Sequence, residues 1–192
     1  LPEFYGYRLT VAFNLAACLM KLHKLGYYII DFKPVNCRLN PKNMNVSIID
    51  CDGFSIKSKE KTYPAYQYTP EYIAPEYLNK KPEDLGLQQD LFCLSVIIFK
   101  LLNNGLHPYQ CKILRGKKIN NLQDMIKNET YAYAIKPSKN YASAVQSIHL
   151  YFPMEIRELF DRSFVSKLRP RANEWAKILI EYADPRRKKL IK

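Results

Sequence analysis

The sequence is short of glycine, paired cysteines and long apolar runs, and each shortage excludes a class of protein. Only six of its 192 residues are glycine and none forms G-x-G-x-x-G, so this chain contains no glycine-rich phosphate-binding loop. Its five cysteines are scattered without a C-x-x-C pair, which argues against a disulfide framework or a zinc site and predicts reduced, buried thiols. The longest apolar stretch, residues 93–99, is too short to span a bilayer, and residues 1–10 lack the pattern of a signal peptide. We therefore expect a cytoplasmic protein without a membrane partner.

Acidic residues are also few, because 18 Asp and Glu face 30 Lys and Arg, which gives a formal net charge of +12. The excess is concentrated in residues 57–61, 112–118 and 186–192. Two interpretations remain open: solvated basic faces with a basic tail, or a surface that attracts an acidic partner. No regularly interleaved aromatic residues accompany these charges, so the pattern disfavours nucleic acid as a partner.

The residues that are present predict one mostly helical domain with a few short strands. Apolar residues recur at helical spacing before Gly26, which ends that helix. A second helix runs to Leu102 and is apolar all round, as is typical of the centre of a domain. Pro153 and Pro170 each begin a later helix. We expect the domain at residues 1–185 and a basic tail at residues 186–192.

The remaining segments predict shorter elements. Residues 27–30 suit a short buried strand or the entry to a turn, and a short strand is expected at residues 46–49. Residues 51–76 are expected to form a loop because they contain three prolines and little periodicity. Residues 113–150 show no clear pattern, apart from a turn or helix cap at Asn120 and Asn121.

A short polar loop carries the candidate chemistry. In Asp31-Phe-Lys-Pro-Val-Asn36, Asp31 could orient an acceptor hydroxyl and take its proton, and Lys33 could reach a γ-phosphate. Asn36 offers an amide oxygen to a metal, and Asp50, at the end of the next strand, offers a carboxylate. The spacing therefore predicts that Asp31, Lys33, Asn36 and Asp50 converge on one point.

Two further signals follow in the chain: Thr69-Pro-Glu-Tyr-Ile-Ala-Pro-Glu76, and Asp90 at the start of the apolar helix. With the polar loop and Asp50, they resemble, in order and rough spacing, the C-terminal lobe of a protein kinase over residues from about 8 to 182. Asp50-Cys-Asp52-Gly-Phe54 and Gly105-Leu-His-Pro-Tyr109 are most similar to bacterial kinase-like proteins with Asp-x-Asp in place of Asp-Phe-Gly.

The resemblance implies roles for residues outside the loop. Asp90 would anchor the loop by accepting hydrogen bonds from the amides of residues 28–31, although Asp90 could also be a helix N-cap. Glu76 would form an ion pair with Arg169, and Lys33 would meet Thr69 near the acceptor, as in Ser/Thr kinases. The three histidines lack a plausible triad partner, so we expect structural or surface roles for His23, His107 and His149.

Three departures from the kinase pattern stand out. Ile29 and Ile30 occupy the positions of the usual His and Arg, so activation by phosphorylation of the loop is not expected. Asp52 replaces a glycine and could be a second metal ligand, a cap, or a change in how the loop moves; we favour the ligand slightly. Arg38 sits where kinases place an apolar residue beneath adenine, and it could turn away, stack on the base or obstruct it.

Two functions remain under consideration. The leading one is a bacterial Ser/Thr protein kinase that uses ATP and Mg²⁺ to phosphorylate protein substrates, and the alternative is a pseudokinase or interaction module that uses the lobe as a binding surface. Asp31, Lys33, Asn36 and Asp50 are all present, which favours the enzyme. Because the N-terminal lobe is absent from this chain, we expect either a fragment, which we favour, or a protein that lacks that lobe.

Overall fold

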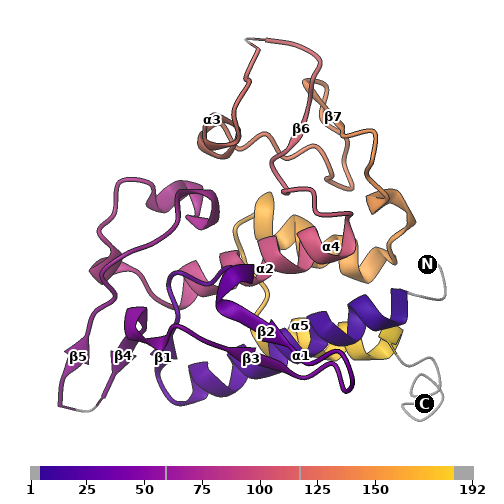
Figure 1. The fold of residues 1–192 in the computed structure, drawn as a ribbon. Coiled ribbons are helices and arrows are strands. Elements are labelled where there is room, and N and C mark those ends of the chain that lie inside the picture. The colour runs from indigo at the N-terminus through magenta and orange to yellow at the C-terminus, as the bar shows by residue number, and fades with distance from the viewer. Residues whose placement is uncertain (1–4, 59, 117, 184–192) are drawn as a thin grey trace.

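In the computed structural model, which describes residues 5–58, 60–116 and 118–183, helix α2 (Leu87–Leu102) runs through the middle of the molecule (Figure 1). Twelve of its 16 residues are buried, and Phe92 and Phe99 are completely enclosed. The all-round apolar sequence therefore predicted its place correctly. The helix begins directly after Gly86, so Asp90 lies in its first turn and the alternative that Asp90 is the N-cap is wrong.

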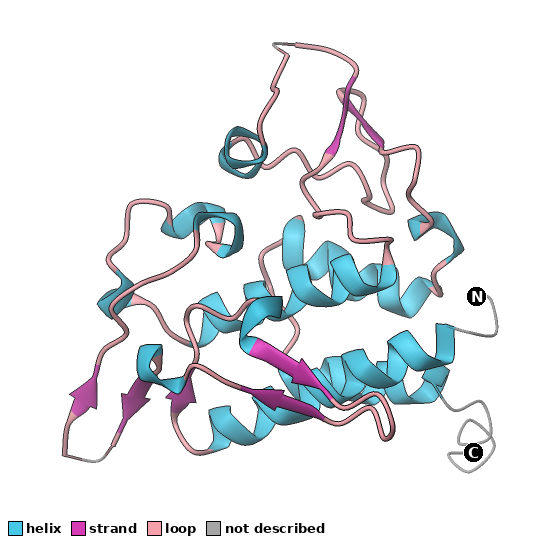
Figure 2. Ribbon diagram, viewed as in Figure 1, coloured by secondary structure: helices cyan, strands magenta, loops and turns pink. Residues whose placement is uncertain are grey.

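Two of the other long helices pack against α2, and a third packs against both of them (Figure 2). Helices α1 (Tyr5–Lys24) and α5 (Ala172–Ala183) lie against each other, and α1 also contacts α2. Helix α4 (Met154–Phe164) contacts both α2 and α5. All three were predicted, and the two later ones follow Pro153 and Pro170 as expected. The Tyr5 hydroxyl donates to the Leu102 carbonyl at 2.7 Å, which fastens the start of α1 to the end of α2.

The described strands form three small antiparallel sheets. One sheet has three strands in the order β1 (Tyr27–Tyr28), β4 (Ser55–Lys57) and β5 (Thr62–Tyr63). The second sheet pairs β2 (Cys37–Leu39) with β3 (Val46–Ile48). The third pairs β6 (Cys111–Ile113) with β7 (Tyr141–Ser143). The prediction that residues 51–76 form only a loop is therefore wrong for β4 and β5. Strands of two or three residues are too short to show an alternating pattern, and the pairing of β4 with β1 and of β5 with β4 decides that they form.

Gly26 forms the turn that connects the end of α1 to strand β1, ahead of the 31–36 loop. Its φ of 77° lies in the left-handed region, and a Cβ at this position would stand 2.8 Å from the Lys57 carbonyl oxygen. The Lys57 amide donates to the Gly26 carbonyl at 3.0 Å, so the two backbones are in direct contact. Only glycine satisfies both the backbone angle and the close approach.

Short turns connect these elements. Helix α3 (Leu122–Lys127) begins after Asn121, whose side-chain oxygen accepts the Asp124 amide at 2.8 Å, so the predicted cap is confirmed. Six single 3₁₀ turns are described, and four of them begin with proline, which suits the first position of a helical turn. They span Pro34–Asn36, Cys51–Gly53, Pro70–Tyr72, Pro75–Tyr77, Pro82–Asp84 and His149–Tyr151.

The five cysteines are unbonded in the structure, but their burial differs from the expectation. Cys93 is enclosed, whereas Cys51 is exposed and Cys18, Cys37 and Cys111 are half-buried, so the prediction of buried thiols is correct only for Cys93. The basic tail expected at residues 186–192 lies outside the described residues. Among the described helices, none is both long and apolar enough to cross a bilayer.

Candidate active site

Asp90 holds the segment that leads into the 31–36 loop. Its carboxylate is completely buried and accepts the amides of Ile29 at 2.8 Å and Ile30 at 2.7 Å, as the sequence predicted. The ring nitrogen Nε2 of His23, on α1, lies 3.0 Å from the same carboxylate. Helix α2 therefore fixes the loop through its backbone, so the fixation does not depend on which side chains stand at positions 29 and 30.

The backbone at Ile30 is strained. Its φ is 61°, a conformation that is unfavourable for a β-branched residue, and the Asp31 amide donates across it to the Ile29 carbonyl at 2.7 Å. Such strain costs about 1–3 kcal/mol and persists only where surrounding contacts enforce it. The bonds to Asp90 are those contacts, and the resulting tight turn directly precedes Asp31.

Lys33 links Asp31 to the segment that contains Thr69. Its ammonium group lies 2.6 Å from Asp31 Oδ2 and donates to Thr69 Oγ1 at 2.7 Å. The other oxygen of Asp31, Oδ1, is buried and has no hydrogen-bond partner among the described residues. The expected meeting of Lys33 and Thr69 is therefore confirmed, and Asp31 keeps one acceptor atom available for a ligand.

The β2–β3 hairpin brings Asp50 beside Asn36. Cys37 pairs with Ile48, and just beyond this pair the Ile49 amide donates to the Asn36 carbonyl at 2.9 Å. Asp50 follows at once, exposed and with φ 62°. The side-chain nitrogen of Asn36 donates to the Asp31 carbonyl at 3.2 Å, so its side-chain oxygen remains for another partner.

The side-chain oxygens of Asn36 and Asp50 are of the chemical kind that magnesium binds together with a phosphate ligand, and their assignment as ligands stays a prediction. Magnesium is commonly held by one or two protein oxygen ligands plus substrate phosphates and water. Asn36 and Asp50 can supply those two. In the part of the chain that the structure describes, no group of three or more His, Cys, Asp or Glu side chains is arranged to hold a metal alone. Asp52 is exposed, and its assignment as a ligand stays a prediction.

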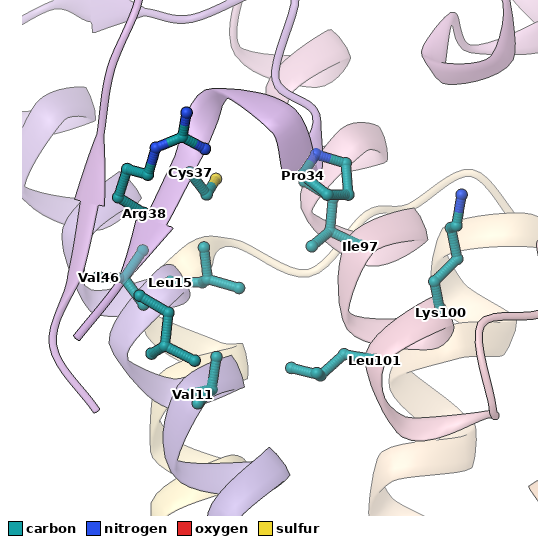
Figure 3. Close-up of a pocket in the computed structure, with 10 residues that line it drawn as sticks. Val11, Leu15, Pro34, Cys37, Arg38, Val46, Ile97, Lys100 and Leu101 are labelled. Atoms are coloured by element: carbon teal, nitrogen blue, oxygen red, sulfur yellow. The ribbon is translucent and has the colours of Figure 1, made fainter. Parts of the chain in front are cut away.

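An apolar groove of about 330 Å³ lies beside the loop, between α1, the β2–β3 hairpin and α2 (Figure 3). Val11, Leu15 and Ile97 line it, and the guanidinium of Arg38 stands at its rim, where Arg38 is exposed. Lys100 lies across the groove from Arg38 and donates to the Tyr72 hydroxyl at 2.9 Å. Arg38 therefore extends toward solvent and does not fill the groove.

Buried partners fix the segment between Thr69 and Glu76. Glu76 forms an ion pair of 2.5 Å with Arg169, whose side chain is 2% exposed against 27% for Glu76, so the predicted partly buried pair is confirmed. The Arg169 guanidinium also lies over the Phe92 ring, 5.3 Å from its centre. Thus Arg169, which precedes α5, connects this segment to the central helix.

Gln89 and His107 also hold this segment in place. Sequence reasoning missed Gln89 and predicted only a structural or surface role for His107. Gln89 accepts the Ala74 amide at 3.1 Å and donates to the Tyr72 carbonyl at 2.8 Å and the Ile30 carbonyl at 3.4 Å. It therefore joins the segment that leads into the 31–36 loop to the 69–76 segment. Its only sequence signal is that it precedes Asp90, which does not predict these partners.

His107 is the second of these residues. Its Nδ1 accepts the Tyr109 amide at 3.2 Å, so Nε2 carries the proton and donates to the Glu71 carbonyl at 3.1 Å. Burial lowers the pKa of His107 to about 3, with a smaller contribution from the charge of Lys100, and the ring is neutral at pH 7. The predicted structural role is therefore confirmed for His107.

The sequence of this chain is similar to those of known proteins. The protein kinase domain family matches residues 9–181, and the chain belongs to that family. It is 27% identical over 185 residues to "Protein kinase YegI" of Escherichia coli (strain K12), an alignment that covers 91% of this chain and 28% of YegI.

Mammalian Ser/Thr kinases match over shorter stretches. The identity is 30% over 106 residues with "Serine/threonine-protein kinase Sgk2" of Rattus norvegicus, covering 50% of this chain and 25% of Sgk2. It is 32% over 105 residues with "Serine/threonine-protein kinase Sgk3" of the same species, covering 53% of this chain and 20% of Sgk3. The chain thus spans less than a third of the length of these relatives.

Proposed function

We propose that this chain is the substrate-binding lobe of a Ser/Thr protein kinase, which transfers the γ-phosphate of ATP to protein hydroxyls. The observation that carries the proposal is the position of Lys33 between Asp31 and Thr69. One cation there fixes a carboxylate of the loop against a hydroxyl of the segment that precedes Glu76. Phosphoryl transfer depends on such positioning and on charge more than on covalent chemistry.

In this proposal Asp31 orients the acceptor. The free Oδ1 accepts the hydrogen bond of the substrate hydroxyl and takes its proton as the hydroxyl oxygen attacks the γ-phosphorus and the bond to the departing ADP breaks. Oδ2 stays bound to Lys33, so the carboxylate keeps one orientation, and the same lysine offers positive charge to the phosphoryl group. Asn36 and Asp50 would hold Mg²⁺, which would supply positive charge to the phosphate oxygens. Asp52 is a further candidate ligand.

The finer parts of the proposal concern the whole protein. An N-terminal lobe upstream of these residues would complete the nucleotide site, and the Asp50-Cys-Asp52 segment supports a bacterial type of kinase. The proposed use of ATP and the unbonded cysteines favour a location in the cytoplasm. The excess of basic residues favours an acidic protein as substrate or partner.

A pseudokinase or interaction module is the second candidate, because an exposed cation, Arg38, occupies a position where an apolar residue would support adenine. The two candidates differ in what they require of the loop. A kinase needs both Asp31 and metal-dependent nucleotide binding, whereas an interaction surface needs neither.

Two substitutions in the full-length protein test the proposal. Asp31→Asn should lower phosphate incorporation into casein by about 10²- to 10⁴-fold and leave nucleotide affinity unchanged, because Asp31 acts on the acceptor. Asp50→Asn should weaken nucleotide binding with magnesium but not without it, because it removes a charged ligand from the ion. Asp84→Asn, at an exposed position, is the matched control and should change neither quantity.

The readouts separate the two candidates. Calorimetric titration of ATP with and without magnesium gives the affinities, and radiolabelled ATP gives the incorporation. If the wild-type protein neither transfers phosphate nor binds nucleotide in a magnesium-dependent way, the kinase proposal is wrong and the interaction module takes its place.

A further inference from the structure

A second cavity, of about 320 Å³, opens beside the two-stranded β6–β7 sheet, between the chain around residues 132–138 and the start of α4. It lies at the β6–β7 end of the molecule, away from the β2–β3 hairpin that follows the 31–36 loop (Figure 1). Its wall is largely apolar and aromatic and includes Tyr133, Tyr141 and Leu150. Small-molecule sites typically have such a wall, a volume of about 300–1,000 Å³ and a few well-placed polar groups.

His149 is the first of those polar groups. It lines the cavity and is 1% exposed, yet neither ring nitrogen has a hydrogen-bond partner among the described residues. Burial, and then the charge of Arg157, lower the pKa of His149 to about 3, although the nearby backbone of Tyr133, whose geometry is not that of a hydrogen bond, raises the pKa slightly. The ring is therefore neutral at pH 7, with one donor and one acceptor nitrogen left for a ligand.

Arg157 is the second polar group. It comes from α4, lines the cavity, and its buried Nε has no hydrogen-bond partner. Its charge lies close enough to affect the pKa values of His149, Asp161 and Tyr131, but it forms no ion pair within the described chain. Asp161 does not line the cavity, and its Oδ2 accepts the Ile135 amide at 3.0 Å. The cavity therefore contains an arginine whose charge no carboxylate contacts directly.

Unsatisfied polar atoms are concentrated at this place. Nine buried side-chain nitrogen and oxygen atoms lack a partner in the described residues, and five of them belong to the neighbours Tyr131, His149, Arg157 and Asp161. A buried polar atom without a partner is costly, so folded proteins rarely keep several together unless a ligand or water completes them. The apolar wall gives water few other partners, which favours a ligand that is itself mostly apolar.

We propose that this cavity binds a small aromatic carboxylic acid, whose carboxylate pairs with Arg157 and accepts a hydrogen bond from the His149 ring, and whose ring system packs between Tyr133 and Tyr141. The positive charge selects a monoanion because an arginine and a carboxylate form strong, charge-assisted hydrogen bonds. The volume, at the lower end of the range for ligand sites, restricts the ligand to one or two rings. This site is separate from the proposed phosphotransfer site and does not depend on it.

The test compares two probes of nearly the same shape, 2-naphthoate and the neutral 2-naphthamide, titrated calorimetrically into the full-length protein. We expect 2-naphthoate to bind about tenfold or more tightly than the amide. Arg157→Gln should remove that preference, and His149→Phe should weaken both probes. Lys177→Gln removes the same charge from an exposed position on α5 and should leave both affinities unchanged.

A cavity-filling variant keeps the test decisive if Arg157→Gln or His149→Phe fails to fold. Ala142→Leu adds bulk from β7 and should abolish the binding of both probes. The proposal is overturned if neither probe binds the wild-type protein, which would leave water or another part of the full-length chain as the occupant. It is also overturned if 2-naphthoate binds equally well to Arg157→Gln and Lys177→Gln, or to Ala142→Leu and wild type.

Discussion

The carboxylate of Asp90 accepts the amide of Ile30 at 2.7 Å and so holds this β-branched residue at a φ of 61°. The same carboxylate accepts the neighbouring amide of Ile29 and lies 3.0 Å from His23. One buried side chain on α2 therefore enforces a strained turn immediately before Asp31. The position of Asp31 depends on a residue that is 59 positions later in the chain.

The first prediction concerns this anchor. Asp90→Asn should destabilise the protein by about 1–3 kcal/mol, because the new amide group can accept only one of the two backbone hydrogen bonds and leaves the other donor buried. Urea denaturation measures the change. Asp84→Asn, at an exposed site, should stay within about 0.5 kcal/mol of wild type. Equal stability of the two variants would show that Asp90 does not hold the turn.

The second prediction concerns the hydroxyl of Thr69, which accepts a hydrogen bond from Lys33. Thr69→Val keeps the shape of the side chain but removes the acceptor, so the kcat/KM for phosphate transfer should fall roughly 10- to 100-fold. Thr69→Ser keeps the hydroxyl and should remain close to wild type. Thr62→Val, on the exposed strand β5, controls for the general effect of the substitution. Equal loss in the Val and Ser variants would mean that the hydrogen bond has no part in activity.

The third prediction is an asymmetry in the ion pair between Glu76 and Arg169. Glu76→Gln leaves the charge of Arg169, 2% exposed, buried and unpaired, and should cost about 3–5 kcal/mol of unfolding free energy. Arg169→Gln leaves Glu76, which is 27% exposed and can reach water, so its cost should be smaller. Denaturation of both single variants and the double variant gives the coupling energy.

The control for this pair is on the surface. Lys81 lies 3.5 Å from Glu83, and both side chains are more than half exposed. Glu83→Gln should change stability by about 0–1 kcal/mol. A Glu76→Gln variant that behaves like Glu83→Gln would mean that Arg169 finds another partner.

The fourth prediction concerns acid stability. Burial lowers the pKa of both His107 and His149 to about 3, from an ordinary value of 6.5. Below pH 6.5 the unfolded chain takes up protons at these residues and the folded protein does not, so stability is lost as the pH falls toward 3. Each histidine should cost about 2 kcal/mol between pH 6.5 and pH 5.

Urea denaturation at pH 7, 6 and 5 measures this slope, in a range above the ordinary titration of carboxylates. His149→Phe should reduce the pH dependence by about half, whatever its effect on stability at pH 7. An unchanged unfolding free energy between pH 7 and pH 5 would show that the two rings protonate in the folded protein.

The sequence by itself determined the central helix and the polar residues of the candidate site. Local signals carry both: the apolar pattern from Leu91 to Leu102 requires burial on every side, and the close spacing of Asp31, Lys33 and Asn36 places them on one loop. The pairs of Lys33 with Thr69 and of Glu76 with Arg169 followed from the resemblance to a known family, because nothing local relates residues so far apart.

Only the tertiary structure decided the features that depend on contacts between distant segments. Strand β4 forms because β1 offers it backbone partners, and β5 forms because β4 does. Gln89 on α2 joins the chain at Ile30 to the segment at Tyr72 by hydrogen bonds to both carbonyls. The cavity beside His149 and Arg157 arises in residues 113–150 and the start of α4, where the sequence showed no clear pattern. The physical reason is that burial and hydrogen-bond partners are properties of the packed chain, so a residue's local sequence cannot specify them.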